Sequence, residues 1–363
     1  MAERGLAGLS KSLFSSLGAS DLENPFEFGT CDRVALVLID GLGYLGLQTF
    51  IDSYKVFKSF HQSSPLSSHF PTTTATNLVS LGTGELPGVH GMLGYTVRVP
   101  RSGEPGRLLN ALKWDERVDP RRWQERPTLF ERAVKDGISV SHIAQKRYEG
   151  SGFTQAGMRG AHYRGANQIS EMIEQASEAL STQRSFAYIY LNDVDVAGHS
   201  YGVGSVQWLS ALERVAHLLE GLMLSLPKGT DIFLTADHGM INVSEKVILG
   251  EGNCLLANVT LIGGEARARH IYLRNGAVEE TVEQWREHFG ESVEIFTHAD
   301  AEGLFGGQVS ADSYDRMGDL IAVPRNGTVL LDPAVVSKET LMVGHHGGFT
   351  QDEVLIPLLS YRT

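Results

Sequence analysis

The ten residues VALVLIDGLG (34–43) indicate the fold of this chain. A short, unbroken apolar run such as 34–39 is typical of a strand buried on both faces of a parallel sheet. Asp40 and Gly41 follow directly. In open α/β sheets, ligands bind beyond the carboxyl ends of the strands, which is where Asp40 would lie. The segment therefore predicts a core strand that ends in a functional carboxylate.

Three more apolar runs have the same character: ISVSHI (138–143), FAYIYL (186–191) and DIFLTA (231–236). Stretches with apolar residues at helical spacing separate them, the longest at 205–226. Strands that alternate with helices predict an α/β fold with a mostly parallel central sheet and helices on both faces.

The alternation stops after residue 254. The following residues mix short strand-like and helix-like pieces, and the chain is expected to return to the core at GDLIAVP (318–324). A segment rich in Arg, Pro and Gly (96–126) is expected to be a long loop or flap. The division we expect is an N-terminal extension packed on the core (1–30), the core (31–254 and 316–363) and a small α+β insertion (255–315).

Composition excludes several classes of protein. The chain has 363 residues, of which 42% are hydrophobic, so it can bury a large core. Its 31 basic and 43 acidic residues give a net charge of −12, which disfavours a nucleic-acid surface or a polybasic membrane contact. The N-terminus has no apolar signal region, and no apolar run reaches the roughly 18 to 20 residues of a membrane span. Two cysteines are too few for a disulfide framework, and we expect a cytoplasmic protein.

Acidic residues and histidines recur at the expected strand ends and near the C-terminus. They are Asp40, Asp195, His199, Asp237, His238 and one of the pair His345-His346. Taken singly, an Asp after a strand is more often a turn former or a helix cap than a ligand. Together at one sheet edge they form a mixed N/O set that suits Zn²⁺ and is acceptable to Mn²⁺ or Fe²⁺. The spacing of four between Asp195 and His199 is expected to fall within a turn or loop.

The segment FPTTTATNL (70–78) is the second signal. Pro followed by threonines before an apolar periodic stretch predicts a helix N-terminus, whose free N–H groups and dipole favour an anion. A threonine hydroxyl there would be available as a nucleophile to a bound phosphate. Plain N-capping explains the segment taken alone, and the expected metal ligands beside it favour the nucleophile.

These residues together resemble the alkaline phosphatase superfamily, and most closely its type I phosphodiesterase/nucleotide pyrophosphatase branch. The resemblance extends from Asp40 to about Leu358 and is carried by VALVLIDGLG, FPTTTATNLVSLGTGELPGVHG, NDVDVAGHSYG, TADHGM and GHHGGFTQDEVLIPLL. It implies an alkaline-phosphatase-like three-layer sandwich that holds two divalent metal ions, with zinc expected and manganese or iron as alternatives. The implied partner is a small phosphate ester or nucleotide.

The resemblance also implies roles for single residues. It gives two ligand sets: Asp40, Asp237 and His238 for one metal, and Asp195, His199 and His346 for the other. Thr74 would be the nucleophile, ahead of Thr72 and Thr73, because it matches the family's threonine within FPTxT. His346 is preferred over His345 because it directly precedes Gly-Gly.

One position departs from the family pattern. Tyr95 stands where related chains usually have an Asn that helps to hold a phosphoryl oxygen. A phenol also donates a hydrogen bond, but with a different reach. Tyr95, Tyr44 and Ser151 are the candidate substrate contacts, although aromatic packing near a loop explains the two tyrosines about as well.

The function expected is hydrolysis of phosphodiester or nucleotide pyrophosphate bonds through a covalent phospho-threonine. The alternatives are a phosphomonoesterase, phosphonate hydrolase or phosphotransferase with the same metals, and a non-catalytic metal-binding protein. The cysteine motif of sulfatases is absent around Thr74, and no GxSxG elbow of a Ser-His-Asp hydrolase follows a strand.

Overall fold

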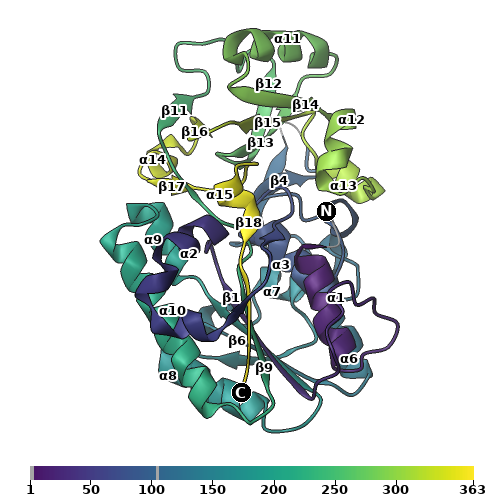
Figure 1. The fold of residues 1–363 in the computed structure, drawn as a ribbon. Helices are drawn as coiled ribbons and strands as arrows, with labels where there is room; N and C mark the ends of the chain where they lie inside the picture. The colour runs from purple at the N-terminus through teal and green to yellow at the C-terminus, as the bar shows by residue number, and fades with distance from the viewer. Residues whose placement is uncertain (1–3, 104–105) are drawn as a thin grey trace.

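A seven-stranded sheet forms the centre of the computed structural model, which describes residues 4–103 and 106–363 (Figure 1). Its strand order is β2-β19-β9-β1-β8-β6-β7. The five strands from β9 to β7 run parallel, and β19 and β2 extend one edge in antiparallel fashion. The strands are β1 (Arg33–Ile39), β2 (His61–Gln62), β6 (Ser139–Ala144), β7 (His162–Gly165), β8 (Ser185–Leu191), β9 (Asp231–Thr235) and β19 (Leu358–Arg362).

Helices cover both faces of this sheet (Figure 1). One layer holds α2 (Tyr44–Phe50), α8 (Ile169–Ala179), α9 (Asp193–Tyr201) and α10 (Val206–Ser225). The other holds α1 (Leu6–Ser16), α3 (Thr74–Thr83), α6 (Leu129–Lys135) and α7 (Gly152–Gly157). The predicted strands, the mostly parallel sheet and the three-layer sandwich are therefore confirmed. Strand β1 lies inside the sheet because its residues 34–39 are apolar on both faces and fully buried.

A small lobe, residues 245–331, lies beyond one end of the main sheet (Figure 1). Its four-stranded antiparallel sheet has the order β12-β13-β15-β14, and β11 pairs with β16 beside it. Its elements are β11 (Glu245–Ile248), β12 (Val259–Glu265), β13 (Ala268–Leu273), α11 (Val278–Phe289), β14 (Val293–Thr297), α12 (His298–Ala301), η5 (Glu302–Phe305), α13 (Ala311–Arg316), β15 (Leu320–Pro324) and β16 (Thr328–Leu331).

At residues 318–324, where we expect the chain to return to the core, the strand joins the sheet of the small lobe and only one of its faces packs in the main core. Strand β15 pairs between β13 and β14 in the small lobe, and all five of its residues are buried. Leu320 and Ala322 pack in the lobe's own core, whereas Ile321 and Val323 belong to the hydrophobic cluster of the main sheet. A short apolar run predicts a buried strand, but it does not say which of two sheets the strand joins. The small lobe is therefore longer than the expected insertion, 255–315.

The flap at 96–126 is more regular than a long loop. Strands β4 (Thr96–Val99) and β5 (Arg107–Asn110) pair as an antiparallel hairpin, and α5 (Pro120–Trp123) follows. Thr96 Oγ1 donates to the Gly264 carbonyl at 2.9 Å, which ties the flap to the small lobe.

Short elements connect these parts. They are α4 (Pro87–His90), α14 (Val336–Glu339), α15 (Gln351–Val354), β3 (Leu66–Ser67), β10 (Ile241–Asn242), β17 (Gly344–His345), β18 (Leu355–Ile356), η2 (Ile51–Ser53), η3 (Lys55–Ser59) and η4 (Lys146–Tyr148). None of the helices in the described part of the chain has the length and hydropathy needed to cross a membrane.

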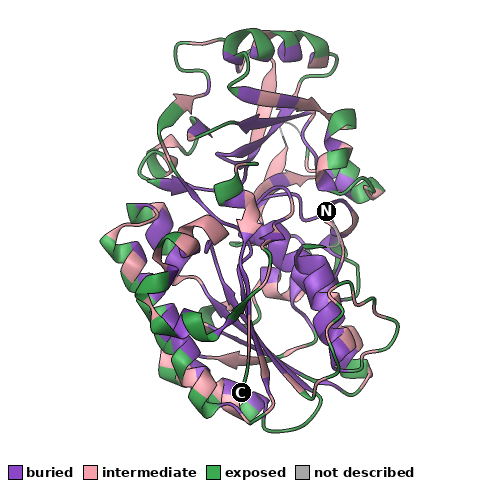
Figure 2. Ribbon diagram, in the orientation of Figure 1, coloured by how far each residue is buried: buried purple, intermediate pink, exposed green. Residues whose placement is uncertain are grey.

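The N-terminal helix α1 is part of the core, not an appendage. Most of its residues are buried (Figure 2). The Phe14 ring is fully buried, with its centroid 4.5 Å from that of Phe186 on β8 and 5.8 Å from that of Phe130 on α6. The helix thus anchors to the main sheet and to a neighbouring helix at once.

We expect Phe14→Ala to lower the free energy of unfolding by about 3–5 kcal/mol, because it leaves a cavity between α1 and the sheet. Urea denaturation followed by circular dichroism measures this change. Val206→Ala is the control, since Val206 is 79% exposed and its truncation should cost less than about 0.5 kcal/mol. An equally small cost for Phe14→Ala would contradict the packing of α1.

Candidate metal centre

Three neighbouring parallel strands deliver the acidic side chains to one place. Asp40 follows β1, Asp237 follows β9, and Asp195 lies two residues into α9, the helix after β8. Since β9, β1 and β8 are adjacent and parallel, their carboxyl ends meet at the same sheet edge. Gly41 permits this close approach: with φ +72°, it faces Asp195, whose Cα would lie 2.9 Å from a Cβ at Gly41.

Asp195 and His199 lie on a helix and not in the turn or loop expected. Residues four apart on a helix share a face, so both side chains of this pair point to the same side of α9. The Asp195 Oδ1 and His199 Nε2 atoms are 3.4 Å apart. Asp193, on the same helix, instead pairs with Arg214 at 2.8 Å.

Asp40, Asp237 and His238 form the first group of potential ligands. One donor atom from each lies within 4.8 Å of the others, and all three residues are buried. His238 Nε2 is 3.3 Å from Asp40 Oδ1 and 3.7 Å from Asp237 Oδ2. The other oxygen of Asp237 accepts the Gly41 N–H at 3.1 Å.

Asp195, His199 and His346 meet beside it. His346 Nε2 lies 3.2 Å from His199 Nε2 and 3.7 Å from Asp195 Oδ1. Atoms of Asp195, His238 and His346 also lie within 4.8 Å of one another, so His238 stands between the two groups. The structure therefore brings together all six side chains that the resemblance implied as ligands. The His345 ring lies farther from His199 than the His346 ring does, with centroid distances of 5.9 and 5.0 Å.

The three histidines share one hydrogen-bond pattern that suits a metal. Each Nδ1 lies next to a backbone carbonyl: His238 at 2.9 Å from Gly239 O, His199 at 2.8 Å from Gly344 O, and His346 at 2.8 Å from Thr72 O. A carbonyl only accepts, so Nδ1 carries the proton in each ring. The Nε2 lone pairs are then free to face the cluster, as in metal-ligating histidines.

Burial shifts the pKa values of the acidic residues in this cluster. It raises the pKa of Asp237 well above its ordinary value and that of Asp195 to about 6, with the Asp40 carboxylate adding to both. Burial also acts to lower the pKa of His238, but the carboxylates of Asp237 and Asp40 outweigh it and raise that pKa to about 10. The cluster thus favours any added positive charge.

Two buried carboxylate oxygens of the cluster, Asp195 Oδ1 and Asp237 Oδ2, have no hydrogen-bond partner in the described structure. A buried, unsatisfied carboxylate oxygen is costly unless it pairs with a cation. These oxygens, together with the three imidazole Nε2 atoms, make a donor set that fits divalent metal ions.

Thr74 is the first residue of α3 and points into the cluster. Its Oγ1 lies 3.3 Å from Asp40 Oδ1 and 3.2 Å from His238 Nε2. Thr72 is engaged elsewhere, because its hydroxyl donates to Gly348 O at 3.0 Å and accepts the Gly347 N–H at 3.0 Å. The geometry therefore singles out Thr74 over Thr72 as the hydroxyl at the metal ligands.

A cavity of about 130 Å³ opens beside Thr74. Aromatic and apolar side chains make up much of its wall, together with polar groups from the strand ends. Its lining residues are Asp40, Thr74, Leu78, Leu112, His142, Tyr148, Ser151, Phe153, Thr154, Met158, Tyr188, Tyr190, Asn192 and Asp195. Tyr190 also donates a short hydrogen bond to Asp40 Oδ2.

The three predicted substrate contacts are placed differently. Ser151 lines the cavity, but its hydroxyl oxygen accepts the Thr154 N–H and caps α7. Tyr44, at the start of α2, and Tyr95 are not among the residues that line it.

Sequence reasoning missed His142, Tyr148, Tyr188 and Tyr190. A period of two along β8 places Tyr188, Tyr190 and Asn192 on one face, and that alternation could have indicated the two tyrosines. Nothing in the sequence around His142 distinguishes it from an ordinary core histidine. Its burial lowers its pKa to about 3, so it faces the cavity as a neutral ring.

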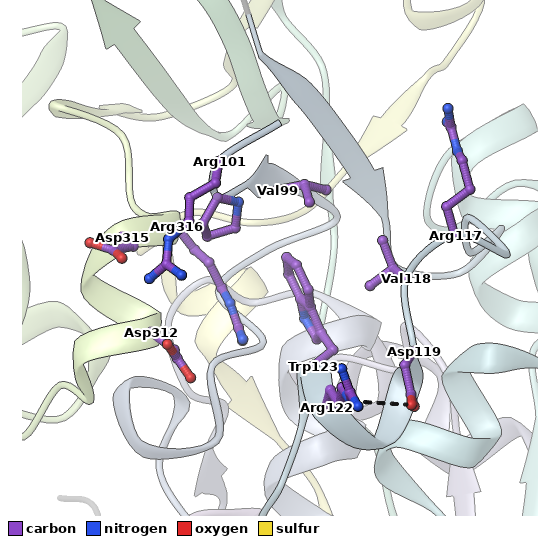
Figure 3. A pocket seen from close by; sticks show the side chains of 11 residues that line it. Val99, Arg101, Arg117, Val118, Asp119, Arg122, Trp123, Asp312, Asp315 and Arg316 are labelled. Carbon is purple, nitrogen blue, oxygen red and sulfur yellow. Dashed lines mark ion pairs between the residues drawn. The ribbon is translucent and has the colours of Figure 1, made fainter. Parts of the chain in front are cut away.

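A second hollow, of about 530 Å³, lies between the flap and α13 (Figure 3). Arg316 lies across the ring of Trp123 there, with its Cζ 3.9 Å from the ring centre. Four arginines face three aspartates in its wall, so the charges nearly balance: Arg101, Arg117, Arg122 and Arg316 against Asp119, Asp312 and Asp315. This hollow shares no lining residue with the cavity at Thr74.

Comparison with known proteins agrees with this arrangement. The family model described as type I phosphodiesterase/nucleotide pyrophosphatase matches residues 34–349. Ectonucleotide pyrophosphatase/phosphodiesterase family member 1 of Rattus norvegicus is 29% identical over 194 residues, and that of Homo sapiens is 28% identical over the same length. Each alignment covers 47% of this chain and only 19% of the relative.

Solved structures show the same fold at low identity. Murine ectonucleotide pyrophosphatase/phosphodiesterase 5, as an inactive threonine-to-alanine variant in complex with AMP, matches with a TM-score of 0.72 at 15% identity. That match covers 91% of this chain and 88% of the other. Phosphonoacetate hydrolase from Sinorhizobium meliloti, in complex with phosphonoacetate, matches with a TM-score of 0.68 at 18% identity, covering 92% and 91%.

We expect divalent metal to stabilise the fold, because it neutralises buried carboxylates that otherwise repel one another. Zn²⁺ or Mn²⁺ at about 100 times its dissociation constant should add about 2.7 kcal/mol per site, and a chelator should remove this gain. Calorimetry and elemental analysis measure the two effects.

Asp237→Asn should bind less metal than the unmodified protein. Asp193→Asn is its matched control, since Asp193 is also acidic and near the site but pairs with Arg214. Equal metal content in Asp237→Asn and the unmodified protein would contradict the proposed ligand set.

Proposed function

Because the chain belongs to the type I phosphodiesterase/nucleotide pyrophosphatase family, we propose that it hydrolyses phosphodiester or nucleotide pyrophosphate bonds with Thr74 as the nucleophile. The observation that carries this proposal is the Thr74 hydroxyl, held between Asp40 and His238 at the start of a helix. The inactive threonine-to-alanine variant of the murine relative is consistent with a nucleophilic threonine in proteins of this fold.

The six side chains Asp40, Asp195, His199, Asp237, His238 and His346 would hold two divalent ions, for which zinc is our first expectation. Such ions lower the pKa of a nearby hydroxyl and offset the charge of a phosphoryl group. The polypeptide supplies the geometry, since the Thr74 hydroxyl donates to Asp40 and is fixed on the first turn of α3.

In the proposed reaction, Thr74 Oγ1 forms a bond to phosphorus while the bond from phosphorus to the leaving oxygen breaks. The hydroxyl proton moves toward Asp40 Oδ1, which already accepts its hydrogen bond. Asp40 then releases this proton, by way of solvent, to the departing oxygen. In the second half, water attacks phosphorus and the Thr74–phosphorus bond breaks. One proton of the water goes to the Thr74 oxygen and the other stays with the product phosphate, so both residues are restored. The N-terminal N–H groups of α3 face the developing negative charge on the phosphoryl oxygens.

The cavity beside Thr74 supports an ester that carries a substituent. Its walls include Tyr148, Phe153 and Tyr188, which suit a flat or apolar group better than a second charge. A diester or a nucleotide offers such a group next to its phosphorus, whereas inorganic pyrophosphate does not.

A phosphonate hydrolase is the second candidate, because the fold also matches phosphonoacetate hydrolase over nine-tenths of both chains. A substrate panel separates the two: bis(p-nitrophenyl) phosphate, a dinucleotide polyphosphate, p-nitrophenyl phosphate and phosphonoacetate. Highest kcat/KM on either of the first two supports the proposal, and highest kcat/KM on phosphonoacetate supports the second candidate. Bound metal without turnover on any substrate would indicate a metal-binding protein that is not an enzyme.

We expect Thr74→Ala to lower kcat by about 10³-fold or more while metal content stays unchanged, because the attacking oxygen is lost. Thr73→Ala is the matched control: Thr73 precedes the helix, and its side chain makes no capping hydrogen bond. Steady-state kinetics on the best substrate of the panel measure both. Substantial activity in Thr74→Ala would overturn the assignment of the nucleophile.

We expect Phe153→Ala to raise KM for bis(p-nitrophenyl) phosphate about tenfold, since losing aromatic burial of about 1.4 kcal/mol corresponds to that factor. Phe289→Ala is the matched control, because Phe289 is as buried as Phe153, at 9% exposure, but lies in the small lobe. Equal KM values for the two variants would show that the cavity does not hold the substituent.

A further inference from the structure

The loop of residues 91–95 is held by three side chains of the small lobe. Arg316 Nη1 donates to Gly91 O at 3.0 Å. His270 Nε2 lies 3.0 Å from Leu93 O, and Glu265 Oε2 accepts the Tyr95 N–H at 2.9 Å. Each contact is made to the backbone of the loop and comes from a different element: α13, β13 and β12.

The polarity of the His270 contact follows from its other nitrogen. His270 Nδ1 accepts the Gly318 N–H at 3.1 Å, so the ring proton must be on Nε2 and is donated to Leu93 O. Burial lowers the pKa of His270 to about 4, which keeps the ring neutral at pH 7. His270 is therefore a fixed link between β13 and the loop.

Glu265 stands between this loop and the metal centre. Gly347, the neighbour of His346, packs so closely on Glu265 that a Cβ there would lie 2.8 Å from its Cγ. Gly94 faces the same carboxylate, with Oε2 3.4 Å from the position of a Cβ. One buried side chain thus separates Tyr95 from the segment that carries His346.

Glu265 is a costly residue for a purely structural role. Its burial raises the pKa of its carboxyl to about 8, only partly countered by the Tyr95 N–H, and Oε1 has no hydrogen-bond partner in the described structure. An apolar side chain of similar volume would fill the space without this desolvation cost.

The same β12–β13 turn fixes the loop that carries His346. Arg267 and Glu353 form a fully buried pair with two hydrogen bonds, of 3.0 and 2.8 Å. Glu353 Oε1 also accepts the Gly348 N–H at 2.8 Å, two residues after His346. The small lobe therefore contacts both the 91–95 loop and the loop that carries His346.

We propose that Glu265 is a positioning residue of the phosphoryl site, which sets residue 95 relative to the metal ligands through the Tyr95 N–H. This rests on the proposed function and on the resemblance, which implies a phosphoryl contact at residue 95, although Tyr95 does not line the cavity beside Thr74. In this proposal the small lobe contributes to the geometry of the phosphoryl site and does not merely cover it.

Glu265→Met and Glu265→Gln test this in the full-length, metal-loaded protein. Methionine fills a similar volume but cannot accept the Tyr95 N–H, whereas the glutamine side-chain oxygen can. We expect Glu265→Met to lower kcat/KM on bis(p-nitrophenyl) phosphate and the affinity for inorganic phosphate by about 10- to 100-fold, with unchanged metal content and a Tm no lower than that of the unmodified protein. Glu265→Gln should stay within about threefold of the unmodified protein on both measures.

Arg269→Met is the matched control in the same hairpin. Arg269 is also buried, but it pairs with Glu339 and makes no hydrogen bond to the 91–95 loop in the described structure. It should lower Tm and leave phosphate affinity within about twofold. If Glu265→Met does not fold, His270→Leu against His270→Gln repeats the comparison at Leu93 O, since only the Gln amide can donate there.

The outcomes separate this proposal from the proposed function. Phosphate affinity and kcat/KM within twofold of the unmodified protein in Glu265→Met would overturn it, as would a Gln variant as impaired as the Met variant. If no substrate turns over but Glu265→Met weakens phosphate binding, the proposed function fails while the positioning role stands. If Thr74→Ala is inactive and Glu265→Met is normal, only the positioning role fails.

Discussion

Three carboxylates crowded at one sheet edge, those of Asp40 and Asp237 on buried residues and that of Asp195 on a partly buried one, impose the constraint on which the site depends. Asp40, Asp195 and Asp237 come from adjacent strand ends, and burial together with mutual repulsion raises the pKa of both Asp195 and Asp237. Such a group is unstable as three anions unless positive charge joins it. The backbone around these carboxylates favours the binding of a cation. Three backbone carbonyls accept the Nδ1 protons of His199, His238 and His346, which leaves the Nε2 atoms facing the cluster. The chain's overall charge of −12 makes this local charge more important for the proposed function, in which an anionic substrate would dock at the same place.

The core of the site could be predicted because it follows from the strand pattern. Buried parallel strands read as unbroken apolar runs, and their shared direction brings the residues after them to one edge. Asp40 and the Asp237-His238 pair are found in this way without knowledge of the helices. Thr74 also follows from local signals, since Pro71 and the threonines mark the start of α3.

What could not be predicted depends on long-range packing. Residues 320–324 form a good buried strand in either sheet, and only tertiary contacts place β15 in the small lobe. His142 and Tyr188 reach the cavity because β6 and β8 are neighbours, which the order of the strands along the chain does not reveal. The role of Glu265 could not be predicted for the same reason. Its partner is the backbone N–H of Tyr95, 170 residues away, and every residue type except proline has such a group.

The use of backbone contacts also bears on the departure at Tyr95. The small lobe holds the 91–95 loop through Gly91 O, Leu93 O and the Tyr95 N–H, and none of these groups depends on which side chain the loop carries. In our proposal, Tyr in place of Asn at residue 95 would therefore change the chemistry offered to a phosphoryl oxygen without loosening the loop. Gly91 could not vary in this way, because its φ of +74° and the Arg316 guanidinium leave no room for a Cβ. In our proposal the small lobe sets the position of residue 95 and its side chain sets the specificity, so that substrate preference could shift at residue 95 while the metal centre stays in place.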